Sequence, residues 1–68
     1  MKYLVVLERT NRNYCAYLPD IPGCVATGRT RPGCLSRLRS ALTMHLEGLR
    51  EDGERVPPPR ATALQVSV

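Results

Sequence analysis

Hydrophobic residues fall in short runs over the first part of the chain, and their spacing predicts three β-strands. Residues 3–7, within a predicted strand over residues 2–9, are all apolar, so this strand is apolar on both faces. Residues 14–18 and 24–27 are two further short, β-prone runs, and the polar residues 9–13 are typical of a hairpin connection. Consecutive strands joined by short turns pair most simply as an antiparallel meander.

The hydrophobic period changes after residue 30 and predicts one amphipathic helix over residues 32–51. Thr30 lies at the position expected for the helix N-cap. Asp52-Gly53 marks the expected C-terminal end of the helix, because Gly is favoured just past a helix end. The leucines of this segment fall within a narrow arc, and they are Leu35, Leu38, Leu42, Leu46 and Leu49.

The end of the chain predicts a fourth strand. Residues 56–60 include three consecutive prolines and form a stiff, extended spacer. Residues 62–68 then alternate, which places Leu64, Val66 and Val68 on a buried face. The predicted fold is α+β in the order β-β-β-α-β, with an antiparallel three-stranded meander and a C-terminal strand in one sheet. One helix packs on one face of this sheet, and residues 1–68 form a single domain.

A single helix covers only one face of a sheet, so the other apolar face of the first strand needs a different cover. A second copy of the chain is the simplest candidate, because a domain of this size buries only about 60% of its unfolded surface. We therefore predict a homo-oligomer, a dimer or tetramer, formed through the outer face of the sheet. The outer residues, expected to point away from the helix, are Leu4, Val6, Cys15 and Tyr17.

The formal net charge is +4, and the basic residues concentrate in the first part of the chain. Residues 1–40 carry seven Lys and Arg against two acids, whereas residues 41–68 carry three Arg against four acids. Arginine suits bidentate anion recognition, although a base-composition bias in the genome would give the same excess. A small basic nucleic-acid-binding module is therefore an alternative function. Its candidate residues are Arg9, Arg12, Arg29, Arg31, Arg37 and Arg39.

Side chains that could carry catalysis are few. His45 is the only imidazole, and it lies at the edge of the apolar arc, where a packing role is more common. Asp20 and Glu8 are the only carboxylates near the strands, too few for a two-metal nuclease site. Asp20 lies between two turn prolines and is typical of a turn-capping side chain. We expect no enzymatic activity, no cofactor and no metal.

The cysteines and the N-terminus indicate the compartment. Cys15, Cys24 and Cys34 are odd in number, widely spaced and without a Cys-x-x-Cys pair, so we expect reduced thiols that pack as small apolar groups. The apolar run at the N-terminus is too short for a signal sequence or a membrane span. The sequence therefore predicts a cytoplasmic protein with no membrane partner.

Several short motifs follow one another in a fixed order along the chain. Leu18-Pro-Asp-Ile-Pro-Gly-Cys24 is followed by Gly28-Arg-Thr30, then by Leu38-Arg-Ser-Ala-Leu42, and later by Gly53 and Pro57-Pro-Pro. This spacing, over nearly the whole chain, resembles the HicB antitoxin family. The resemblance implies a fold like part of ribonuclease H without its catalytic acids. It also implies an antitoxin that binds and silences a HicA toxin, a small mRNA-cleaving protein, and that forms dimers or tetramers.

The chain departs from the family pattern in charge and in length. Pro32, Gly33, Arg37 and Ser40 stand where the family usually has acidic residues, an Asn and a Glu. Longer members add a C-terminal DNA-binding domain, which a chain ending at Val68 is expected to lack. A surface that masks a basic toxin gains from negative charge, and a net charge of +4 does not supply it. The predicted function is a non-enzymatic HicB-like antitoxin, or an orphan relative, that acts by protein–protein contact.

Overall fold

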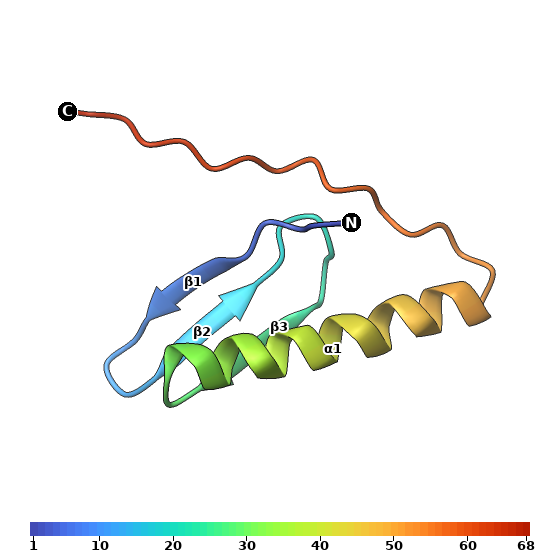
Figure 1. The fold of residues 1–68 in the computed structure, drawn as a ribbon, viewed down its shortest axis with the longest axis horizontal. Helices are drawn as coiled ribbons and strands as arrows, with labels where there is room; N and C mark the ends of the chain where they lie inside the picture. Colours follow the sequence, from blue (N-terminus) through green and yellow to red (C-terminus); the bar gives the residue numbers. More distant parts are fainter.

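A computed structural model describes all 68 residues and contains three strands followed by one helix (Figure 1). The strands are β1 (Val6–Arg9), β2 (Tyr14–Tyr17) and β3 (Val25–Gly28), and the helix α1 spans Arg31–Glu51. The strands form one antiparallel sheet in the order β1-β2-β3. The predicted α+β class and three-stranded meander are confirmed, with β1 starting later than the sequence pattern suggested.

The inner face of the sheet packs against α1. Leu7 pairs with Ala16 and Ala16 with Ala26, so these side chains line one face of the sheet. Leu7 and Ala26 pack against a core of six buried residues. These core residues are Ala16, Leu18, Ile21, Cys24, Cys34 and Leu38. The helix therefore covers the face that the alternation of the strands predicted.

The loop between β2 and β3 supplies part of this core. Ile21 is 1% exposed and Cys24 is 3% exposed, although both lie outside the strands. The Ile21 N–H donates to the Leu18 carbonyl at 3.1 Å, and the Cys24 N–H donates to the Ile21 carbonyl at 3.3 Å. Gly23 has a φ of 83°, in the left-handed region that glycine adopts without strain. The turn residues thus bring Ile21 and Cys24 into the core.

The two ends of α1 follow the predicted signals. Thr30 is the N-cap, and its hydroxyl oxygen accepts a hydrogen bond from the Gly33 N–H at 3.0 Å. Beyond the C-terminus, Gly53 has a φ of 71°, and its N–H donates to the Arg50 carbonyl at 3.1 Å. Both helix boundaries are therefore set by local residues.

Gly28 marks the closest approach between β3 and α1. A Cβ atom at this position would lie 2.7 Å from the backbone nitrogen of Cys34. The Cys34 side chain is fully buried, and its sulfur lies 3.6 Å from the carbonyl oxygens of Tyr14 and Ala26. The first turns of α1 are thus held tightly against β2 and β3.

The predicted C-terminal strand does not form. Residues 54–68 run extended past the sheet without pairing (Figure 1). Leu64, Val66 and Val68 are 87%, 83% and 123% exposed, so their predicted burial is wrong. Residues 57–59 are prolines, which have no N–H to donate to a strand ladder, and residues 62–68 beyond them pair with no strand of the sheet. An alternating pattern fixes which side chains share a face, but it does not provide a neighbouring strand.

Candidate functional site

The structure assembles no cluster of metal-binding side chains. No group of three or more His, Cys, Asp or Glu residues lies where it could hold a metal ion. His45 is half-buried on α1, and all three cysteines are free. Burial raises the pKa of the Cys24 thiol, which disfavours the reactive thiolate.

The 21-residue helix α1 is not apolar enough to span a membrane.

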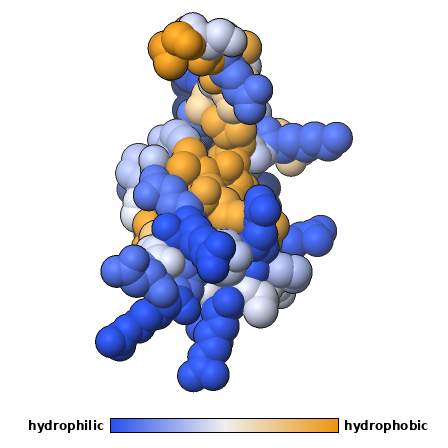
Figure 2. All heavy atoms as spheres, turned by 90° about the vertical axis from the view of Figure 1, so that its left-hand side faces the viewer, coloured by the Kyte–Doolittle hydropathy of each residue, from blue (hydrophilic) through white to orange (hydrophobic).

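Five of the six candidate arginines line three neighbouring hollows at one end of the molecule. These five residues, called the arginine cluster below, are Arg9, Arg12, Arg29, Arg31 and Arg37. All five are exposed, and long hydrophilic side chains protrude from this end of the molecule (Figure 2). Arg39, the sixth candidate, lines none of the hollows.

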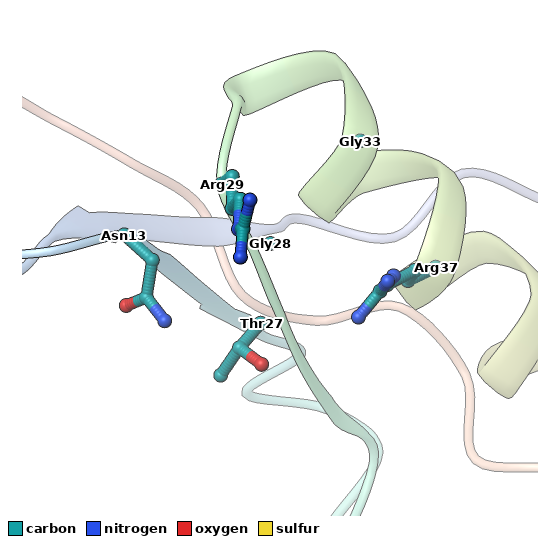
Figure 3. A pocket seen from close by; sticks show the side chains of 6 residues that line it. All are labelled: Asn13, Thr27, Gly28, Arg29, Gly33 and Arg37. Atoms are coloured by element: carbon teal, nitrogen blue, oxygen red, sulfur yellow. The ribbon is translucent and has the colours of Figure 1, made fainter.

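The largest hollow lies between β3 and the first turns of α1. Its volume is about 350 Å³, and it is lined by Asn13, Thr27, Gly28, Arg29, Gly33 and Arg37. Figure 3 shows Arg37 reaching from α1 toward β3, with Arg29 between it and Asn13. The second hollow, of about 160 Å³, shares Asn13 and Arg29 with the largest one. The third, of about 270 Å³, shares Arg9 and Tyr14 with the second.

The turn between β1 and β2 is held by local hydrogen bonds. The Thr10 hydroxyl lies 2.7 Å from Oδ1 of Asn13 and accepts from the Asn13 N–H at 3.1 Å. The Thr10 N–H donates to the Asn13 carbonyl at 2.8 Å. These bonds fix the backbone that carries Arg12. The cluster therefore combines flexible guanidinium side chains with a well-defined backbone.

The outer face of the sheet presents a row of apolar side chains across all three strands. Val6 pairs with Tyr17, and Tyr17 pairs with Val25. Tyr17 is 39% exposed and Val25 is 61% exposed. In the next row, Cys15 lies half-buried between its strand neighbours. Val25 was not among the predicted interface residues, although the alternation within residues 24–27 could have identified it.

Leu4 lies outside the strands. It precedes β1, is half-buried, and stands between Tyr3 and Val5, both of which pack against the core. Three of the four predicted interface residues, Val6, Cys15 and Tyr17, therefore lie in strands, while Leu4 lies on the segment that leads into β1.

Asp20 links the β2–β3 loop to the C-terminal segment. Its Oδ2 accepts hydrogen bonds from the Arg60 N–H at 2.9 Å and the Ala61 N–H at 3.0 Å. These backbone donors, Ala61 foremost, hold the pKa of the Asp20 carboxyl below its ordinary value. The Tyr3 hydroxyl donates to the Pro57 carbonyl on the same segment. Asp20 therefore bonds to a distant segment, where a local turn-capping role was predicted.

The sequence pattern did not identify two further residues that line the largest hollow. Asn13 and Thr27 are neutral, and each lies at the end of a predicted connection or strand, where a structural role is the ordinary interpretation. The sequence feature that could have identified them is their position next to candidate arginines, Asn13 beside Arg12 and Thr27 two residues before Arg29. They add an amide and a hydroxyl to the largest hollow, both able to hydrogen-bond an anionic oxygen.

Comparisons with known families and structures relate the chain to a toxin-antitoxin family. The sequence model of the HicB_like antitoxin of bacterial toxin-antitoxin systems matches residues 3–67. A chain in a solved structure described as the HicA3 and HicB3 toxin-antitoxin complex is 30% identical, with a TM-score of 0.72. The match covers 87% of this chain and 70% of that chain.

Two curated relatives differ in how much of their length is matched. A 14.9 kDa protein from the rep-hol intergenic region of Haemophilus phage HP1 is 35% identical over 57 residues, or 84% of this chain. The match spans 43% of that relative, so the chain covers less than half of its length. A UPF0150 protein of Thermoplasma acidophilum is 28% identical over 67 residues, which is 97% of both chains.

Proposed function

This chain belongs to the HicB-like antitoxin family, and from this premise we propose that it is a non-enzymatic antitoxin. It binds a HicA-type mRNA-cleaving toxin and neutralises it by protein–protein contact in the cytoplasm. The observation that carries the proposal is the likeness, at 30% identity and a TM-score of 0.72, to a chain of a toxin-antitoxin complex. Residues 1–68 act as one HicB-like domain in this proposal.

The chemistry of the chain supports a binding role. The carboxylate of the β2–β3 loop, Asp20, already accepts hydrogen bonds from backbone donors of the C-terminal segment. The Cys24 thiol is buried and its pKa is raised, which makes it a poor nucleophile. Inhibition by occupying a toxin requires a binding surface rather than a catalytic group.

Co-expression with a HicA-type toxin from a neighbouring gene tests the antitoxin role. We expect the two proteins to co-purify and the chain to restore growth of cells that express the toxin. A Leu38→Arg variant serves as a negative control, because it places a charge at a core position that is 2% exposed. Failure of the folded chain to bind or neutralise the neighbouring HicA-type toxin contradicts the proposal.

We further propose that the chain works as a homo-oligomer through Leu4, Val6, Cys15 and Tyr17, together with Val25. Only six residues are buried, and an apolar row crosses the face of the sheet opposite the helix. Burying apolar surface stabilises a small domain by about 25 cal/mol per Å². A second copy on this face would therefore supply stability that the small core does not.

Light scattering coupled to size exclusion tests this assembly separately from the antitoxin role. We expect the unmodified chain to be a dimer or tetramer, and Tyr17→Lys to shift its mass toward the monomer. Met44→Lys is the matched control, because Met44 lies on α1 and is already 72% exposed. A monomeric unmodified chain, or equal behaviour of the two variants, contradicts the interface but leaves toxin binding open to its own test.

A further inference from the structure

We propose that the arginine cluster binds the phosphate backbone of a nucleic-acid duplex. This site is separate from the toxin-binding role, and nothing in the proposed antitoxin function requires it. The five arginines come from the end of β1, the β1–β2 turn, the β3–α1 junction and the first two turns of α1. The fold thus gathers positive charge from segments far apart in the sequence onto one end.

The electrostatics at this end favour an anionic ligand. No carboxylate lines any of the three hollows. Glu8, next to Arg9 on β1, is the carboxylate nearest this end, and it lines none of the hollows. The acids of the second half of the chain, at positions 47, 51, 52 and 54, lie at or beyond the other end of α1. The cationic side chains therefore face solvent without a neutralising partner in the hollows, and their field attracts and steers polyanions.

The hollows also provide the groups that contact phosphate. Arginine presents a planar fork of donors that matches two phosphate oxygens, and Arg29 and Arg37 converge on the same space (Figure 3). Asn13, just before β2, and Thr27, on β3, add neutral donors to this hollow. Arg, Asn and Thr are among the side chains that bind phosphate and sugar in protein–DNA complexes, and such bonds are about half to two-thirds of all protein–DNA hydrogen bonds.

The lining favours nucleic acid over an acidic protein surface. The largest hollow has no apolar lining residue, and Leu7 and Tyr14 are the only ones in the other two. A protein interface normally buries an apolar centre, whereas nucleic-acid interfaces are polar and strongly positive. The apolar row of Val6, Tyr17 and Val25 lines none of the hollows.

The aromatic residues favour a duplex over a single strand. Single-strand binders stack bases on exposed aromatic rings. Tyr14, the one aromatic residue in the hollows, packs against the hydrophobic core, and Tyr17 lies on the sheet elsewhere. Without a stacking platform, binding depends on the density of phosphates, which a duplex doubles relative to one strand.

Fluorescence anisotropy with labelled 20-nucleotide probes tests this site in the full chain. The probes are duplex DNA, duplex RNA and a single strand, each at 50 and 200 mM salt. We expect a duplex to bind more tightly than the single strand and to lose about 100-fold in affinity over this range, as three to four phosphate contacts predict. No binding at 50 mM salt, or tighter binding of the single strand, overturns the proposal.

A pair of triple variants with equal charge change isolates the cluster. Arg12→Gln/Arg29→Gln/Arg37→Gln should weaken duplex binding by about tenfold or more and flatten its salt dependence. Arg50→Gln/Arg55→Gln/Arg60→Gln lowers the net charge equally at positions outside the hollows and should keep most of the affinity. All six side chains are exposed, and circular dichroism checks that both variants remain folded. Equal losses overturn the site, as does equal competition by polyglutamate of matched charge.

Discussion

Gly28 is the residue at which one added methyl group would disturb the packing of α1 on the sheet. The missing Cβ leaves room for the backbone of Cys34, 2.7 Å from where that atom would stand. Because the neighbour is backbone and Cys34 is fully buried, the helix itself would have to move. The glycine in the Gly28-Arg-Thr30 motif is therefore explained by close packing.

We expect Gly28→Ala to lower the free energy of unfolding by about 1–3 kcal/mol, the usual cost of overpacking. Gly48→Ala is the control, because Gly48 lies within α1 and its added Cβ would meet nothing within 4 Å. Alanine there should raise the free energy of unfolding by about 0.5–1 kcal/mol through helix propensity. Urea denaturation measures both, and a destabilisation of similar size in each would contradict the packing argument.

Asp20 holds the C-terminal segment through its carboxylate, so this contact should depend on pH. The pKa of Asp20 is lowered by the Ala61 and Arg60 N–H donors, so the contact is fully formed above the ordinary aspartate pKa of about 3.9. It weakens as the pH falls below that value through the lower pKa of the folded protein. NMR should show the Arg60 and Ala61 amide signals shifting with a midpoint below the ordinary aspartate pKa.

Asp20→Ala should abolish that titration, because no carboxylate then accepts from the two amides. Glu54→Ala serves as the control, since Glu54 is exposed and its side chain has no hydrogen bond in the structure. If the Arg60 and Ala61 signals titrate alike in all three proteins, the contact is not the cause.

At the scale of the elements, local sequence patterns predicted the three strands that pair in the sheet and the helix that packs on it. The helix followed from its period and caps, and β2 and β3 followed from their alternation. The structural β1 begins at Val6, which pairs with Tyr17. Continuing that register would set Leu4 opposite Pro19, but the chain has already turned there, where the Ile21 N–H donates to the Leu18 carbonyl at 3.1 Å. Residues 2–5 therefore have strand-like sequence without strand pairing.

The C-terminal segment, residues 62–68, also has a strand-like sequence but pairs with no strand. Its alternating sequence is compatible with a strand, but pairing depends on a neighbour that no local pattern specifies. Because Leu64, Val66 and Val68 are exposed, removal of residues 62–68 should change the free energy of unfolding by less than about 0.5 kcal/mol. Urea denaturation of the shortened chain measures this change, and a loss above about 2 kcal/mol would show that the segment packs in solution.

At the scale of the whole molecule, the family could be predicted from turn residues, whereas the shape of the candidate site could not. Prolines and glycines from Leu18 to Thr30 act locally, so their spacing is readable in the sequence. The arginine cluster depends on how the hairpin meets the helix. Arg37 and Arg39 are two residues apart, about 200° around a helix, so only one of them can face the hollow. Charge counts identified both as candidates, and the fold separated them.

We propose that this chain silences a toxin by occupying it. The most direct measurement is the mRNA-cleaving activity of the cognate HicA-type toxin, titrated with increasing amounts of the purified chain. Stoichiometric binding predicts that activity falls linearly and reaches zero at a fixed ratio of the two proteins. Cleavage that persists at a large excess of folded chain, or that stops at far below one chain per toxin, would contradict the account.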